Sequence, residues 1–262
     1  MAKRKKKKKR AYTPPETAEG EAVETKVAPK KEGPPSERRE RKEEVRRRKE
    51  KELKSWQRKN MLRRGIRYAV ILGGIAAVTV FFLNRRQAAE EAQGRLEKEA
   101  AAAATAVGCT DVENREDLGG NHLTANEPFD YPDRPPTSGP HDPGPLPADP
   151  HVYNELMQET RAVHNLEHGF VVIYYRDEGK GALPENVVKA LEPVARDSYK
   201  VIMAPYDGLQ EGNALALTAW NRRQQCPSKV DADQATTIAR SFIQRFTGNG
   251  VDSVAPEKDI PA

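Results

Sequence analysis

The hydrophobic pattern of the chain is dominated by one apolar run, residues 65–83 (GIRYAVILGGIAAVTVFFL), in which Arg67 is the single charge. As a helix with a rise of about 1.5 Å per residue, this run would span roughly 28 Å, close to the hydrocarbon thickness of a membrane. Arginines flank it on both sides, and more than 60 residues precede it, which is unlike a cleaved signal peptide. The pattern therefore predicts a transmembrane helix over 65–83.

The polar segments around this run predict the rest of the organisation. Residues 36–64 are almost all Glu, Arg and Lys, with opposite charges three or four positions apart, which favours a charged cytoplasmic helix. Residues 84–107 are rich in Ala and Glu and predict a helical stalk. Residues 1–35, a basic block followed by a Pro-rich stretch, are expected to be a disordered cytoplasmic tail. A globular domain is expected over 108–250, with a flexible tail at 251–262.

The first half of this domain begins with an extended segment and continues with a helix and a strand. Residues 127–150 contain nine prolines, which predict an extended wrap because proline donates no ladder hydrogen bond. The near-continuous apolar run at 170–175 predicts a strand that is buried on both faces. Between them a helix is expected over 154–166, with an inward face made of Leu156, Met157, Thr160, Val163 and His164.

The second half of the domain repeats this alternation. Pro184 is expected to begin a helix, 201–204 and 214–220 to form strands, and Asp231 with Gln234 to form a capping box that opens a last helix. The inward positions of the two helices would be Val187, Val188, Leu191, Val194 and Ala195, and then Ala235, Ile238, Ala239, Phe242 and Phe246. The order α-β-α-β-β-α predicts an α+β fold, a small sheet with packed helices, and a thioredoxin-like layer arrangement is a fold-level analogy for it.

The charge distribution predicts the orientation in the membrane. Residues 1–67 carry 26 basic and 11 acidic side chains, whereas residues 84–262 carry 18 and 28. Because basic residues concentrate on the cytoplasmic side, a single-pass cell-membrane protein is expected, with its N-terminus in the cytoplasm and its C-terminal domain outside. The basic tail would lie near anionic lipid or serve only as a topology signal. Nucleic-acid binding is disfavoured, since no aromatic residues interleave with the charges.

The two cysteines, Cys109 and Cys226, bracket the expected domain. Both fall on the side where disulfides persist, so a disulfide is predicted between them. The alternative, a pair of free thiols that act in redox chemistry, lacks a Cys-x-x-Cys motif.

The histidines are the strongest functional signal, because all five lie between positions 122 and 168. His164 and His168 stand one helical turn apart, a spacing that lets two imidazoles share a metal. If His122 and His141 join them, the nitrogen-rich ligand set would suit copper or zinc. Glu167, Tyr131 and Tyr174 are candidate partners that would orient the ligands. His151, beside Pro150, is expected to be exposed and separate.

Two other hypotheses remain open for the same residues. The sequence His164-Asn165-Leu166-Glu167-His168 matches the H-x-x-E-H pattern of inverted zinc metalloproteases, in which Glu167 would act as the base of metal-dependent hydrolysis. Gly169 ends the helix at once, which disfavours this interpretation. Alternatively, the motif histidines are structural, and the domain is a non-catalytic assembly module for a protein partner outside the cell. Whether the protein is an enzyme stays open.

The stretch Pro135-Pro136-Thr137-Ser138-Gly139-Pro140-His141, followed by His164-Asn165-Leu166-Glu167-His168-Gly169 and an apolar strand, resembles the domain of unknown function 3105 family. The resemblance covers about Cys109–Thr247, and His122 lies where that family tends to place a histidine. It implies one N-terminal membrane span with the domain outside, and it implies no particular reaction.

Overall fold

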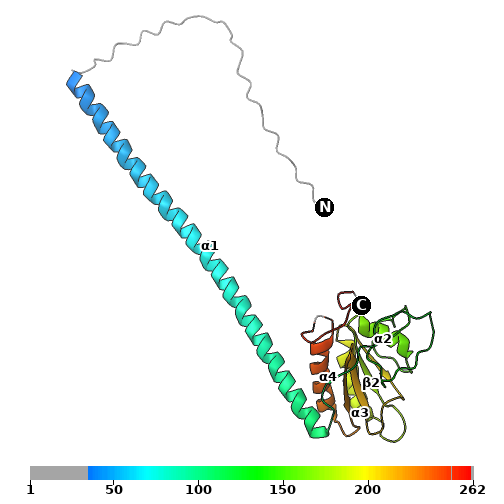
Figure 1. Cartoon of the computed structure of the whole chain (residues 1–262). Coiled ribbons are helices and arrows are strands. Elements are labelled where there is room, and N and C mark those ends of the chain that lie inside the picture. The colour runs from blue at the N-terminus through cyan, green and yellow to red at the C-terminus, as the bar shows by residue number, and fades with distance from the viewer. Residues whose placement is uncertain (1–34, 249, 261–262) are drawn as a thin grey trace, which may run out of the picture. The chain divides into compact units, whose positions relative to one another are not determined.

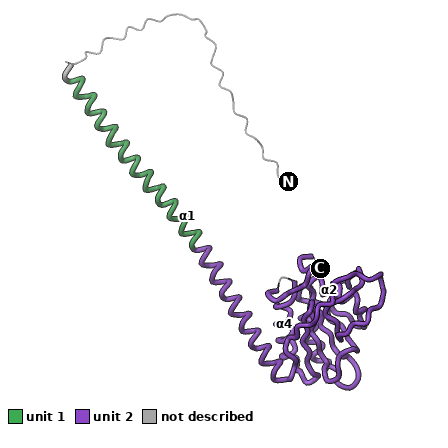
Figure 2. The backbone as a smooth tube through the Cα atoms, viewed as in Figure 1, with its two compact units in different colours: residues 1–76 green, residues 77–262 purple. Residues whose placement is uncertain are grey.

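The structure, a computed structural model, describes residues 35–248 and 250–260 (Figure 1). The expected disordered tail, residues 1–35, therefore lies outside the described residues except for Pro35. The chain divides into two compact units, residues 1–76 and residues 77–262 (Figure 2). The second unit contains the folded domain.

Helix α1, Pro35–Val107, combines the three helical segments that were expected separately over 36–64, 65–83 and 84–107. Its charged part carries ion pairs one turn apart, for example Arg46 with Glu50 at 3.3 Å. Within the described part of the chain, α1 is the one helix that is long and apolar enough to cross a membrane, and none of its apolar window is buried.

The domain is built on a five-stranded mixed sheet with the order β1-β5-β4-β2-β3. The interior strand β2, Val171–Tyr175, pairs in parallel with the edge strand β3, Val201–Pro205, and antiparallel with β4, Leu215–Ala219. Strand β5, Arg222–Cys226, pairs antiparallel with β4 on one side and with the two-residue β1, Glu113–Asn114, on the other. The structure confirms the mixed α+β fold, but β1 and β5 were not predicted.

The sheet is buried on both faces, as the apolar run of β2 indicated. Val171 and Ile173 lie in one core cluster with the helices α3 and α4, Glu185–Arg196 and Ala232–Phe246. Val172 and Tyr174 point to the opposite face, where they pack against helix α2, Glu159–Glu167, and the Pro-rich segment. This alternation follows from the two-residue period of a strand.

Helices α3 and α4 confirm their sequence patterns. Asp231 caps α4 by accepting a hydrogen bond from the Gln234 N–H, and the Gln234 side chain accepts one from the Asp231 N–H. The five predicted inward positions of α4 are all buried, and those of α3 are buried except the partly exposed Val188.

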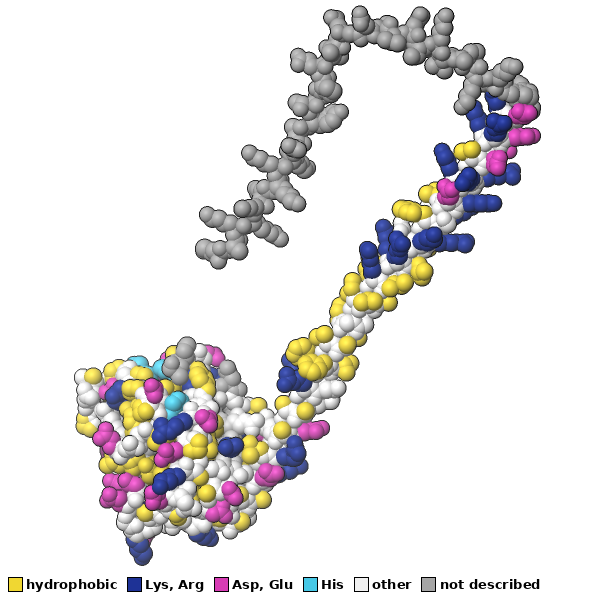
Figure 3. All heavy atoms as spheres, turned by 180° about the vertical axis from the view of Figure 1, so that it is seen from behind, with side chains coloured by type: hydrophobic (Ala, Val, Ile, Leu, Met, Phe, Trp, Pro, Cys, Tyr) yellow, Lys and Arg dark blue, Asp and Glu magenta, His cyan; other side chains and the backbone are white. Residues whose placement is uncertain are grey.

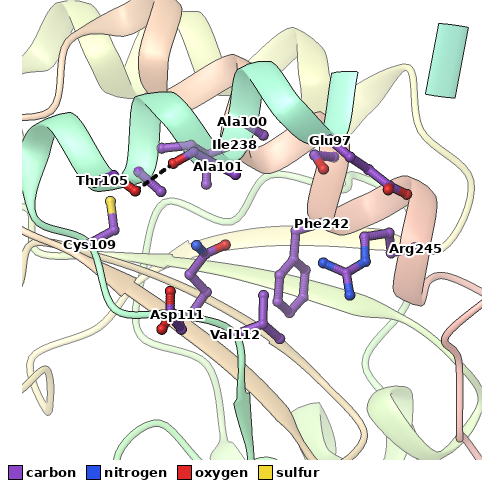
Figure 4. A pocket seen from close by; sticks show the side chains of 13 residues that line it. Glu97, Ala100, Ala101, Thr105, Cys109, Asp111, Val112, Ile238, Phe242 and Arg245 are labelled. Atoms are coloured by element: carbon purple, nitrogen blue, oxygen red, sulfur yellow. Dashed lines mark hydrogen bonds between the residues drawn. The ribbon is translucent and has the colours of Figure 1, made fainter. Parts of the chain in front are cut away.

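The last turns of α1 belong to the domain core, so the domain begins before the expected boundary at residue 108. Ala104 and Val107 are buried in the cluster that contains α4. Where α1 passes α4, the two helices border a cavity of about 200 Å³ that is lined by Ala101 and Thr105 of α1 and by Phe242 and Arg245 of α4 (Figure 4).

Helix α2 begins later than predicted, because the residues that precede it are pulled into an extended conformation along β3. The Tyr153 N–H donates to the Met203 carbonyl, and the Met203 N–H donates to the His151 carbonyl, both at 2.8 Å. The helix therefore starts at Glu159 instead of 154, and Leu156, expected on its inward face, is 57% exposed. Gly169, at φ 79°, then turns the chain directly into β2.

The residues after α4 pack onto the domain, whereas a flexible tail was expected over 251–262. Ala255 is buried in the cluster beneath α2. The buried ammonium group of Lys200 donates to the backbone carbonyls of His168, Lys258 and Ile260, the first two at 2.7 and 2.9 Å. Burial lowers the pKa of Lys200, and the carbonyl oxygens satisfy its donors.

The predicted disulfide between Cys109 and Cys226 is present. It joins Cys109, two residues beyond the end of α1, to the last residue of β5, and it closes a sequence separation of 117 residues.

Removing this disulfide should strongly destabilise the domain, because a loop of this length restricts the unfolded chain by about 4–5 kcal/mol in the chain-entropy treatment. We expect full-length protein with both cysteines changed to serine to unfold at lower urea concentration than the wild type. Reductant should lower the urea midpoint of the wild type and leave that of the double variant unchanged. Equal urea midpoints for the wild type and the double variant in the absence of reductant would contradict the prediction.

Candidate functional site

The histidine cluster is assembled from three separate segments of the chain. A parallel bridge aligns His122 with His141: the Leu123 N–H donates to the His141 carbonyl at 2.7 Å, and the His141 N–H donates to the Asn121 carbonyl at 3.0 Å. Helix α2 supplies His164 near its C-terminal end, and His168 caps that end. Histidine side chains accordingly reach the surface in one region of the domain (Figure 3).

Backbone carbonyls fix the orientation of two of these rings. The Nδ1 atom of His141 lies 2.8 Å from the Gly139 carbonyl oxygen, and the Nδ1 atom of His164 lies 2.8 Å from the Asp142 carbonyl oxygen. A carbonyl only accepts, so each Nδ1 carries the proton, and each neutral ring keeps a lone pair on Nε2. Both rings are thus held in the tautomer that can ligate a metal through Nε2.

His122, His141 and His164 form a nearly equilateral triangle. Their ring centroids are separated by 5.0, 5.2 and 5.0 Å, and one nitrogen of each ring lies within 4.8 Å of the others. Three imidazoles on one tetrahedral ion, with metal–nitrogen bonds of about 2.0 Å, would also have centroids about 5 Å apart. The triangle therefore has the dimensions of a three-histidine metal site.

A second group, Glu167, His168 and Glu257, adjoins the triangle, and its ligand atoms also lie within 4.8 Å of one another. The two groups are in contact, because His164 Nε2 lies 3.1 Å from His168 Nε2, and His141 Nε2 lies 3.1 Å from Glu167 Oε2. His168 Nε2 is also 3.1 Å from Glu257 Oε2. All four histidines predicted from the sequence are thus brought together, and two carboxylates lie among them.

Burial shapes the electrostatics of the cluster. His141 and His164 are buried, whereas His122 is exposed, so the cluster opens to solvent on one side. Burial lowers the pKa of His141, His164 and His168, which favours neutral rings. Burial, and then the charge of Glu257, raises the pKa of Glu167.

The Nε2 atom of His141 is the least satisfied polar atom of the cluster. It is fully buried and makes no hydrogen bond to any described residue, although Glu167 Oε2 lies 3.1 Å away. The direction of this contact does not suit a hydrogen bond, and the Nδ1 proton is already engaged by Gly139. A buried nitrogen lone pair without a donor is costly unless something else binds it.

Small residues shape the space around the ligands. A side-chain carbon added at Gly120 would lie within 3.0 Å of the Glu167 carboxylate, so the glycine leaves room for that group. Gly139, at φ 123°, lies against the Tyr131 ring, and the Tyr131 hydroxyl donates to the Pro140 carbonyl at 2.6 Å. Tyr131 therefore supports the loop that carries His141 and acts on the cluster only through the backbone.

Two other candidates from the sequence lie apart from the cluster. Tyr174 packs in the core beside Tyr206, with ring centroids 4.9 Å apart, and among the described residues no hydrogen bond joins it to the four histidines. His151 bonds the Val201 carbonyl through Nδ1 at 2.7 Å and stays separate, as expected, although it is half-buried.

Sequence reasoning missed Glu257, because it lies in the segment that was expected to be flexible. The Glu257 N–H donates to the Glu167 carbonyl at 3.0 Å, which brings the segment back onto α2. No local motif in the sequence marks this long-range contact.

A family model described as "Protein of unknown function (DUF3105)" matches residues 122–259, more than half of the chain. No curated protein and no solved structure matches it. The matched region begins at His122 and includes the other three histidines and both carboxylates of the cluster. By this match the chain belongs to the DUF3105 family, which confirms the resemblance of its two histidine motifs.

Proposed function

We propose that this is a single-pass membrane protein whose extracytoplasmic domain binds a transition metal ion, copper or zinc, through His122, His141 and His164. The observation that carries the proposal is the triangle of imidazoles from three segments, with the dimensions of a tetrahedral site. In this proposal the fourth position faces Glu167 and His168.

The chemistry of the donor atoms favours copper or zinc over other biological cations. Neutral imidazole nitrogens suit zinc and copper, whereas magnesium and calcium prefer oxygen ligands. The buried, unbonded Nε2 of His141 would be satisfied by an ion. The carbonyls of Gly139 and Asp142 would act as the outer partners that orient metal-bound histidines.

The same hydrogen bonds support one alternative, a non-catalytic assembly module. Through its bond to Asp142, His164 ties α2 to the Pro-rich segment without any ion, so the histidines could be purely structural. Under this alternative, substituting His141 or His164 lowers stability, and metal changes nothing.

Hydrolysis with Glu167 as base is less compatible with the geometry. A general base in such a site acts on a metal-bound water, and needs space for it. Glu167 Oε2 instead lies 3.1 Å from His141 Nε2, the separation expected of two neighbouring ligands on one ion. We therefore propose metal binding and assign no reaction.

The apolar window of α1 and the charge asymmetry of the chain support the membrane part of the proposal. Basic residues dominate before the window and acidic residues after it, which favours a cytoplasmic N-terminus.

The proposal predicts the metal content of the protein. Full-length protein in detergent should bind copper or zinc at micromolar concentration, and His141→Ala should weaken binding by more than the roughly 10–100-fold typical of losing an outer partner. Elemental analysis after desalting measures this. His151→Asn is the matched control, because His151 adopts φ 64°, which asparagine tolerates, and lies outside the cluster. A wild type that takes up neither metal would overturn the proposal.

Melting temperature separates metal binding from the assembly alternative. Free metal at about 100 times its dissociation constant should stabilise the wild type by about 2.7 kcal/mol, since it binds only the folded state. The same addition should raise the melting temperature of His141→Ala much less, because the three-histidine site is broken. If the metal stabilises neither protein, while the variant melts lower than the wild type, the assembly alternative is the better account.

Acidification should destabilise the metal-free protein. Burial lowers the pKa of His141, His164 and His168 below the ordinary 6.5, so below that pH the unfolded chain binds more protons than the folded chain. Their contribution to stability is complete above about pH 6.5 and is lost as the pH falls toward the lowered values. Glu167, whose pKa is raised by burial and then by the charge of Glu257, acts in the opposite direction, but it is one group against three.

The measurement is the melting temperature of chelator-treated protein between about pH 7.5 and 5.5, a range that brackets the ordinary histidine pKa. It should fall across this range, and it should fall less in His164→Gln, which lacks one of the three rings whose pKa is lowered. A melting temperature that rises on acidification would contradict the assignment of neutral rings.

Protease protection tests the orientation. In sealed right-side-out vesicles, an epitope tag at the C-terminus should be removed by added protease, and a tag at the N-terminus should be protected until detergent is added. The reverse pattern would contradict the orientation that the charge asymmetry predicts.

A further inference from the structure

The cluster contains more ligand groups than one tetrahedral ion can use. His122, His141 and His164 form one group of three, and Glu167, His168 and Glu257 form another, each with its ligand atoms within 4.8 Å of one another. The two groups do not share a residue. A tetrahedral ion takes four ligands, so one ion would leave part of the second group without a role.

Specific hydrogen bonds hold the residues of the second group in place, as they do those of the first. The backbone bond from Glu257 to Glu167, at 3.0 Å, and the three carbonyls held by Lys200 fix the C-terminal segment against the end of α2. The Gly248 N–H donates to the Gly169 carbonyl at 2.7 Å, and the two glycines pack closely enough that a side chain on Gly169 would meet the Gly248 backbone. Glu257 therefore reaches the cluster through fixed contacts.

Glu167 faces both groups and lacks a donor of its own. Its side chain is only 8% exposed, and none of the described residues donates a hydrogen bond to its carboxylate. Its Oε2 atom lies 3.1 Å from His141 Nε2 and 4.0 Å from His122 Nε2, and it also belongs to the group of His168 and Glu257. A buried carboxylate between two sets of nitrogen ligands has the position of a bridging ligand.

Charge points to the same conclusion. Glu167 and Glu257 each place a carboxylate oxygen within 4.8 Å of the other, and among the described residues neither forms an ion pair with a lysine or arginine. Two converging carboxylates without a positive partner are unfavourable, and a divalent cation between them would remove the repulsion.

We propose that the cluster binds two metal ions: one on His122, His141 and His164, and a second on Glu167, His168 and Glu257, with the Glu167 carboxylate bridging them. This inference rests on the proposed function. Bridged ions of this kind lie about 3.5–4 Å apart. The second site, with two carboxylates and one imidazole, suits zinc or another divalent first-row ion better than copper in its reduced state.

Metal stoichiometry tests the inference on full-length protein in detergent, loaded with zinc and desalted. The wild type should hold about two ions per chain, and Glu257→Gln and His168→Ala should each hold about one, because the histidine triangle remains. Asp259→Asn is the matched control, since it removes a carboxylate from the same segment outside the cluster and should keep about two. Circular dichroism and melting temperature verify that each variant is folded.

The outcomes are distinguishable from those of the proposed function. One ion in the wild type overturns the two-ion inference and leaves the proposed function standing, whereas no ion overturns both. Two ions in the wild type that persist in both Glu257→Gln and His168→Ala overturn the assignment of the second site.

Magnetic coupling provides an independent measurement. Two copper(II) ions about 4 Å apart couple, so copper-loaded wild type should give a weakened electron paramagnetic resonance signal for its copper content. Glu257→Gln should recover the full signal of an isolated ion. An uncoupled wild-type signal that accounts for all bound copper would overturn the bridged arrangement.

Discussion

The site depends on how the fold satisfies buried imidazoles. A buried neutral histidine must place one ring proton on an acceptor and its lone pair on a donor or a metal. In His141 and His164 the proton is engaged by the carbonyls of Gly139 and Asp142, which belong to the Pro-rich segment. These two hydrogen bonds fix which ring nitrogen faces the cluster. They also make the positions of the rings depend on the folding of the Pro-rich segment, which contains no helix and no strand of the sheet.

The sheet makes this arrangement rigid. Because β2 is an interior strand that is buried on both faces, α2, which leads directly into it through Gly169, has little freedom to move. The Pro-rich segment then packs over α2, and the parallel bridge adds His122 to the edge of that layer. Ligands that are distant in the sequence are therefore held by the packing of the layers.

Sequence patterns predicted the elements whose side chains have a clear period, and failed where long-range contacts decide. The apolar run of β2, the capping box at Asp231 and the disulfide followed from local spacing and composition. The concentration of the histidines between positions 122 and 168 raised the hypothesis of a shared site, but long-range contacts join their segments. The sequence of strand β5 (RRQQC) is polar, yet four of its five residues are buried. The charge of one of them, Arg223, is paired with Glu113 of β1 at 2.8 Å. Residues 154–158 have a helical pattern, but β3 draws the preceding backbone into extended pairing. No local sequence pattern marks Glu257, because its position depends on two long-range contacts. Lys200 binds the carbonyls of Lys258 and Ile260, and the Glu257 N–H donates to the Glu167 carbonyl.

The hydrogen bonds from the Lys200 ammonium to the carbonyls of Lys258 and Ile260 have a consequence for proteolysis of the chain. These contacts lie beyond α4 in the sequence and contribute nothing to the pairing of the five strands. Cleavage of the chain between the end of α4 and Glu257 would detach Glu257 and two of the three carbonyls that the Lys200 ammonium binds, while all five strands and both cysteines stay in the remaining chain. A single cut outside the sheet would thus leave the ligand set of the cluster incomplete.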